Sequence, residues 1–142
     1  MIEVVIEEPA WESALPQAEA LAAQAAEAAT PGSDIAILLT SDEAVRAMND
    51  QFRGVDKPTN VLSFPASGLP GDHLGDIALA FGVCAREAEA QGKTLAAHLQ
   101  HLVAHGALHL VGYDHEEEAG AEAMEARERE ILARLGHADP YG

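Results

Sequence analysis

The sequence predicts an α/β (α+β) fold, in which one domain spanning residues 1–142 packs helices against a mixed sheet of about four strands. Three observations support this prediction. A chain of 142 residues suits one domain with one core, and 48% of the residues are hydrophobic. Strand-like and helix-like segments alternate in the first half, whereas the last third is helical. No internal repeat or linker interrupts this pattern.

The first three elements form a strand–helix–strand unit. Residues 2–6 place apolar, mostly β-branched side chains at alternate positions, which is typical of a strand. Ser13 can cap a helix that runs to about Ala29. Pro16 is tolerated in this helix because it falls in the first turn. The nearly continuous apolar segment 34–39 is expected in the interior of a sheet. The intervening helix predicts that these two strands are parallel.

The remaining elements follow in the order helix, two strands and three helices. Thr40 and Glu43 fit a capping box for a helix that ends near Asn49. Thr94 can cap the long helix after it, and Gly112 can end that helix in a left-handed turn. The other expected elements are strands 61–64 and 76–81, a loop over 65–74, and helices 84–91, 95–111 and 114–136.

The composition limits the possible partners and compartments. The formal net charge is −16, with only eight Lys and Arg residues, which argues against broad non-specific binding of nucleic acid. A nucleic-acid site must therefore be small and built around the five upstream cations, Arg46, Arg53, Lys57, Arg86 and Lys93. No apolar run approaches the ~20 residues of a membrane span. The single cysteine, Cys84, is expected in the core and is compatible with a reducing, cytoplasmic compartment.

The segment from His105 to His115, with the sequence HGALHLVGYDH, predicts a metal site. His105 and His109 are four residues apart and lie on one face of the expected helix. A turn at Gly112 folds the chain back, so that His115 can supply a third nitrogen. A catalytic zinc ion, Zn2+, is usually bound by three protein ligands and keeps one coordination position open. Another divalent transition metal can use the same ligands. Asp114 can either orient a ligand imidazole or cap the next helix.

His101 and His105 are also four residues apart and offer a competing register, but His101, His105 and His109 span about 12 Å and cannot all reach one tetrahedral ion. His98 and His101 are therefore expected either beside the ligands or at the surface. The glutamates of the last helix are expected on a solvated face, opposite an apolar stripe that includes Met124 and Ile131.

The histidine and glycine spacing matches the zinc peptidase signature, with one departure. Gly106 stands where that signature has the glutamate that acts as general base. A bound metal can still activate water, but the usual proton acceptor is absent. An ordinary peptidase is therefore disfavoured, and a reaction such as phosphodiester cleavage needs that base less.

These residues resemble the signature of the YbeY endoribonucleases, the bacterial ribosomal RNA maturation factors. The resemblance includes the segment NDQFRGVDKPTNVLSFP (49–65), the segment LGDI (74–77) and the C-terminal LG and DPY (135–136 and 139–141). It implies a zinc-dependent endoribonuclease that prefers single-stranded RNA and acts in ribosomal RNA processing and ribosome quality control. It also places the metal ligands of the family on His105, His109 and His115, and its functionally important arginine on Arg53.

The chemistry of Arg53 agrees with this resemblance, because a guanidinium binds phosphate oxygens with two donors and stabilises developing phosphoryl charge. Lys57 and Asn60, on the following loop, are weaker candidates for substrate binding. As an alternative, Arg53 pairs with Asp56 or with the acidic C-terminal helix.

Three functions follow from the sequence. The first is a metal-dependent endoribonuclease acting on single-stranded or ribosomal RNA. The second is a non-catalytic ribosome assembly factor with a structural metal, which the acidity favours as a partner of basic ribosomal proteins. The third is a peptide or small-molecule metallohydrolase, which Gly106 disfavours.

Overall fold

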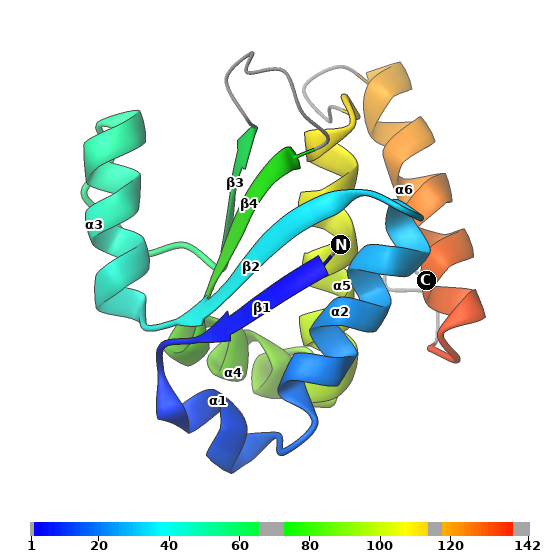
Figure 1. Cartoon of the computed structure of the whole chain (residues 1–142). Coiled ribbons are helices and arrows are strands. Elements are labelled where there is room, and N and C mark those ends of the chain that lie inside the picture. Colours follow the sequence, from blue (N-terminus) through cyan, green and yellow to red (C-terminus); the bar gives the residue numbers. More distant parts are fainter. Residues whose placement is uncertain (1, 66–72, 114–117, 138–142) are drawn as a thin grey trace.

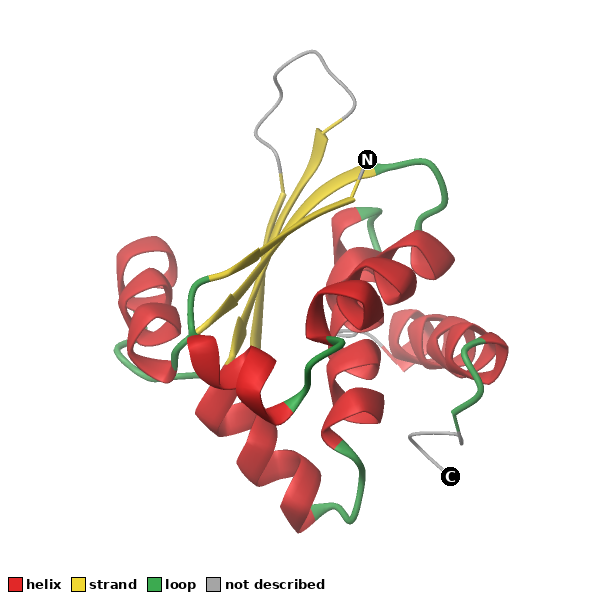
Figure 2. Ribbon diagram, turned by 60° about the horizontal axis from the view of Figure 1, so that its bottom comes forward, coloured by secondary structure: helices red, strands yellow, loops and turns green. Residues whose placement is uncertain are grey.

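The computed structural model describes residues 2–65, 73–113 and 118–137. In these ranges it contains strands β1 (Ile2–Ile6), β2 (Asp34–Thr40), β3 (Val61–Pro65) and β4 (His73–Ala80). Its helices are α1 (Pro9–Ala14), α2 (Ala18–Ala29), α3 (Asp42–Arg53), α4 (Phe81–Ala90), α5 (Leu95–Leu110) and α6 (Glu118–Arg134). The sheet lies between α3 on one face and α2, α5 and α6 on the other side (Figures 1 and 2). The predicted fold class is confirmed.

The sheet is mixed, and its strand order is β1-β2-β4-β3. β1 and β2 are parallel, as predicted, and β2 is also parallel to β4. β3 pairs antiparallel with β4 alone among the described strands, so β3 is an edge strand. This position leaves the outer side of β3 available to the functional site.

The two faces of the sheet bury different apolar clusters because successive side chains of a strand point to opposite faces. Ile37 of β2 and Ile77 of β4 face the larger cluster, which also contains buried residues of α2 and α5. Leu62 of β3 and Ala78 of β4 face a smaller cluster with Val45 of α3. The fold is therefore a sheet with most of its core on one side and a single helix on the other.

The N-terminal crossover contains two helices, so the prediction of one helix capped by Ser13 is wrong. α1 begins at Pro9, which is tolerated at a first helical position, and the side chain of Glu8 accepts a hydrogen bond from the backbone N–H of Ala10 at 3.2 Å. Trp11 is fully buried, and its Nε1–H donates to the carbonyl of Thr40 at 3.0 Å. Pro16 falls between the two helices, where a proline ends a helix rather than continuing it.

The capping residue of α3 is Ser41 rather than Thr40, which remains in β2. The Ser41 hydroxyl accepts from the N–H of Ala44 at 3.1 Å. α3 also continues past the predicted end at Asn49 to Arg53, because the first residue with a left-handed backbone is Gly54, at φ 69°.

The boundary between β4 and α4 also differs from the prediction. β4 runs from His73 rather than Asp76, and Phe81 belongs to α4 instead of ending the strand. A hydrogen bond from outside the helix stabilises the first turn of α4. The Asp42 carboxylate of α3 accepts from the backbone N–H of Val83 at 3.0 Å.

The helix that carries the histidines agrees closely with the prediction. Thr94 caps α5 by accepting from the N–H of Ala97 at 3.1 Å, and the helix ends at Leu110. α6 ends at Arg134, two residues before the predicted end, and its predicted cap, Asp114, lies outside the described residues. None of the helices in the described ranges combines the length and the apolar character that crossing a membrane requires.

Candidate active site

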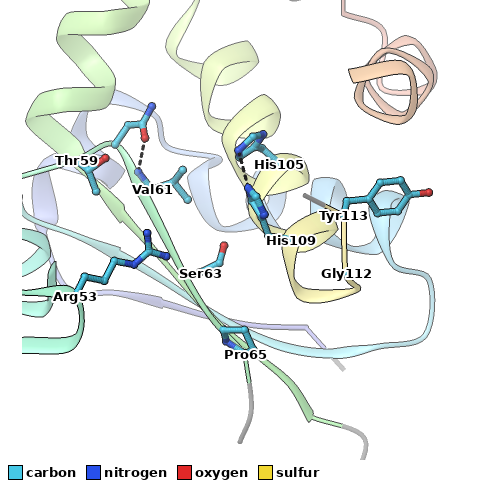
Figure 3. Close-up of a pocket in the computed structure, with 10 residues that line it drawn as sticks. Arg53, Thr59, Val61, Ser63, Pro65, His105, His109, Gly112 and Tyr113 are labelled. Carbon is cyan, nitrogen blue, oxygen red and sulfur yellow. Dashed lines mark hydrogen bonds between the residues drawn. The ribbon is translucent and has the colours of Figure 1, made fainter. Parts of the chain in front are cut away.

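A cavity of about 690 Å³ lies beside the edge strand β3 (Figure 3). Its lining comes from three parts of the chain. Arg53 comes from the end of α3, and α5 with its following turn supplies His105, His109, Gly112 and Tyr113. β3 and the residues before it supply Thr59, Asn60, Val61, Ser63 and Pro65. The cavity therefore brings together residues that are more than 50 positions apart in the sequence.

His105 and His109 point toward each other within this cavity (Figure 3). Their Nε2 atoms are 3.2 Å apart, and their ring centroids are 4.7 Å apart. Two nitrogens bound to one tetrahedral zinc at ~2.1 Å would lie about 3.4 Å apart. The two imidazoles therefore fit a shared divalent cation. The predicted third ligand, His115, lies outside the described residues, and within those residues no group of three potential ligands gathers.

The turn after α5 has the conformation that the sequence predicts. Gly112 has φ 101°, which side chains other than glycine resist. The N–H of Tyr113 donates to the carbonyl of Leu108 at 3.0 Å, and the N–H of Gly112 donates to that of His109 at 3.1 Å. These bonds close the helix end just after the second histidine and turn the chain away from the helix axis.

Gly106 lies where α5 packs closely against β3 and β4. Ser63 donates from its hydroxyl to the Gly106 carbonyl at 3.1 Å. A Cβ atom at position 106 would lie 3.0 Å from the Ser63 hydroxyl oxygen and 3.1 Å from Cγ2 of Ile77. A glutamate at this position would thus point into the packed interface between helix and sheet. The packing of α5 therefore disfavours the general base of the peptidase signature at this position.

Arg53 is exposed at the end of α3, and its side chain extends toward β3 (Figure 3). The alternative pairing with Asp56 is wrong, because Arg46 holds that carboxylate through Nε at 2.7 Å and Nη2 at 3.1 Å. The hydrogen bonds and charge of Arg46 also lower the pKa of Asp56. Within the described residues Arg53 forms no ion pair. Its guanidinium is therefore available to an anion in the cavity.

The two weaker substrate-binding candidates differ in position. Asn60 lines the cavity, but its Nδ2 donates to Oε1 of Glu87 at 3.0 Å and its Oδ1 accepts from the N–H of Val61 at 2.7 Å. It therefore shapes the wall next to β3. Lys57 is exposed and does not line the cavity. The cavity lining also includes Thr59 and Tyr113, which lie in the two motif segments but were not among the predicted site residues.

Glu128 is the main residue that sequence reasoning misplaced. The sequence predicts it on the solvated face of the last helix, but its side chain is fully buried. Its carboxylate bonds to Nδ1 of His105 and lies 3.2 Å from Nε2 of His101. Its spacing from Met124 and Ile131, four and three residues, places it within the apolar stripe and could have revealed its burial.

His98 and Cys84 lie away from the cavity. His98 is 3% exposed, and its Nε2 lies 2.9 Å from Oε1 of Glu87. Burial lowers the pKa of His98, because the charged form loses its hydration. Cys84 is buried as predicted, and burial raises the pKa of its thiol. Neither residue is placed to contact a substrate in the cavity.

Comparison with known proteins identifies the family. The sequence profile described as Endoribonuclease YbeY matches residues 3–136. This chain belongs to the YbeY family. It is 52% identical to the Endoribonuclease YbeY of Maricaulis maris over 99% of this chain and 91% of that protein. It is 50% identical to the protein of the same name from Rhodopseudomonas palustris (strain BisB18), over 98% of this chain and 90% of the relative.

A solved structure shares this fold. The solution structure of a Thermotoga maritima protein superposes with a TM-score of 0.58 at 25% sequence identity, covering 99% of this chain and 98% of that one. In this YbeY family member, the cavity combines two converging imidazoles with an available guanidinium on the other side of an edge strand. Such an arrangement can hold a cation next to a phosphate group.

Proposed function

We propose that this chain is a zinc-dependent endoribonuclease that prefers single-stranded RNA and acts in the cytoplasm in ribosomal RNA maturation and ribosome quality control. The relatives named Endoribonuclease YbeY support the endoribonuclease activity. The observation that carries the proposal is the 3.2 Å approach of the His105 and His109 Nε2 atoms in the cavity that Arg53 also lines.

The cation and phosphate parts of the site have separate tasks. His105 and His109, with His115, are the residues that would hold zinc. When bound, zinc supplies a Lewis acid beside the scissile phosphate. The guanidinium of Arg53 donates hydrogen bonds to phosphoryl oxygens and stabilises the charge that develops on them. Cleavage within an RNA chain therefore depends on both parts of the cavity.

The surrounding residues limit the alternatives. The Ser63 hydroxyl is engaged by the Gly106 carbonyl, which argues against a role as nucleophile. Gly106 supplies no base, and a side chain at that position would be in close contact with Ser63 and Ile77. These features argue against a peptidase of the ordinary zinc type.

The size of the cavity and the net charge favour single-stranded RNA. A cavity of about 690 Å³ suits a phosphate and its adjoining nucleotide rather than a duplex. Duplex recognition relies on a long positive surface, whereas this chain has a formal net charge of −16. RNA segments that are unpaired during ribosome assembly are substrates of this type.

The proposal is tested by metal analysis combined with a cleavage assay. We expect about one zinc per chain, by the ligand count of a single catalytic site. We expect His109→Ala and Arg53→Ala each to abolish cleavage of single-stranded ribosomal RNA, with zinc lost only in the first variant. Arg86→Ala is the matched control, because Arg86 is exposed and lies outside the cavity lining. Undiminished cleavage by metal-free protein or by His109→Ala protein would contradict the proposal.

The acidic composition favours a second candidate, a non-catalytic assembly factor whose metal stabilises the fold. In that case zinc removal would lower both the melting temperature and ribosome association, and no preparation would yield an RNA product. Sedimentation of the zinc-loaded and zinc-free protein with ribosomal particles, run beside the cleavage assay, separates the two functions.

A further inference from the structure

Glu128 is a fully buried carboxylate in a helix whose other glutamates, where their exposure is described, are at least partly exposed. It lies between Met124 and Ile131 on the side of α6 that packs toward α5. A carboxylate in such surroundings loses its hydration, which costs several kcal/mol unless charged or polar partners replace the water. Its partners must therefore compensate this cost.

Two imidazoles of α5 are among these partners. One carboxylate oxygen bonds to Nδ1 of His105, and the other lies 3.2 Å from Nε2 of His101. His101 and His105 are one helical turn apart, so one carboxylate of α6 contacts two successive turns of the histidine helix. Glu128 thus connects α6 directly to a residue that lines the cavity.

This contact determines which nitrogen of His105 carries the hydrogen and which has a free lone pair. An ionised carboxylate only accepts hydrogen bonds, so Nδ1 of His105 carries the hydrogen. In the neutral ring the lone pair is then on Nε2, which is the atom 3.2 Å from Nε2 of His109. A metal binds an imidazole through such a lone pair, and a carboxylate on the other nitrogen fixes the tautomer and the ring orientation.

We propose that Glu128 is a positioning residue of the metal site, holding His105 with its Nε2 lone pair directed at the cation. The inference rests on the metal site of the proposed function, and it makes α6 a part of the structure that supports this site. It means that zinc affinity depends on a residue that does not contact the ion. It also means that the docking of α6 and the binding of metal stabilise each other.

Three variants test this role. Glu128→Met removes the acceptor and keeps an unbranched chain of similar length in an apolar position. Glu128→Gln is the conservative variant, since its amide oxygen can still accept from Nδ1 of His105. Glu130→Met makes the same substitution at an exposed position of α6, where Glu130 pairs only with Arg127 and Arg134 within the described residues, and serves as the matched control.

The first measurement is zinc affinity, determined by competition with a chelator. We expect Glu128→Met to lose about 10- to 100-fold in affinity, the usual cost of removing a carboxylate behind a ligand histidine. Glu128→Gln should recover most of this loss, and Glu130→Met should bind zinc like the wild type. A folded Glu128→Met protein whose affinity stays within about threefold of the wild type would overturn the proposal, since that lies well below the expected loss.

The second measurement is the tautomer of His105 in the metal-free protein, by long-range ¹H–¹⁵N NMR at about pH 8, where an ordinary imidazole is neutral. We expect Nδ1–H in the wild type and in Glu128→Gln, and a shift toward Nε2–H in Glu128→Met. An Nε2–H tautomer in the wild type would overturn the proposal even if Glu128→Met fails to fold. Failure of the wild type to bind zinc would instead contradict the proposed function, and the tautomer would still be measurable.

Discussion

The close approach of α5 to the sheet makes Gly106 sensitive to the addition of a single methyl group. In Gly106→Ala the new Cβ would lie 3.0 Å from the Ser63 hydroxyl oxygen and 3.1 Å and 3.3 Å from two carbons of Ile77. Overpacking of this kind costs about 1–3 kcal/mol, and loss of the Ser63 hydrogen bond costs about 1 kcal/mol. The better helix propensity of alanine returns about 1 kcal/mol. We therefore expect a net destabilisation of about 1–3 kcal/mol.

Urea unfolding followed by circular dichroism measures this change, and a double-mutant cycle identifies its cause. Ser63→Ala alone should cost about 1 kcal/mol, because the Gly106 carbonyl loses its partner. In the double variant the Cβ at position 106 no longer meets the Ser63 oxygen, so the combined cost should be smaller than the sum of the two single costs. A neutral or stabilising Gly106→Ala, or strictly additive costs, would refute the close-packing explanation.

Three further outcomes are expected. The pKa of His98, followed by NMR, should lie below the ordinary 6.5 because the ring is buried, so stability present above pH 6.5 should be lost as the pH falls below that value. The pKa of Asp56 should lie below 3.8 in the wild type and return toward it in Arg46→Ala; the stability from this pair is present above about pH 4 and lost on further acidification. Gly112→Ala should lower the free energy of unfolding by about 1–2 kcal/mol, because φ is 101° at this position, and a melting curve unchanged from the wild type would contradict this expectation.

The sequence predicted the sheet and the histidine helix well because their signals are local. Thr94 caps α5, and Gly112 ends it, through hydrogen bonds between residues that are close in the sequence. The element boundaries that the sequence predicted wrongly depend on contacts between residues that are far apart in the sequence. α1 contains Trp11, which is bonded to a carbonyl of β2, and the first turn of α4 is bonded to Asp42 of α3. Local periodicity carries no information on such contacts.

The candidate site shows the same division. The pairing of His105 and His109 follows from helical geometry, and the structure brings Arg53 to the cavity that they line. Two features of the site depend instead on how separate helices and loops pack. Asp56 pairs with Arg46, and Glu128 is buried against α5. Charge is a poor guide at Glu128, since the residue occupies an apolar position of its helix. The predicted ligand His115 remains a prediction, because it lies outside the described residues.

The two sides of the cavity rest on different apolar clusters. Arg53 belongs to α3, which packs on the small cluster around Val45 and Leu62, whereas the histidines belong to α5, which packs on the large cluster of the opposite face. Substitutions beneath α3 can therefore shift the guanidinium without disturbing the imidazoles. In the proposed zinc endoribonuclease, such a protein would bind the ion normally and yet cleave RNA poorly, so that metal loading alone would be an insufficient measure of a competent enzyme.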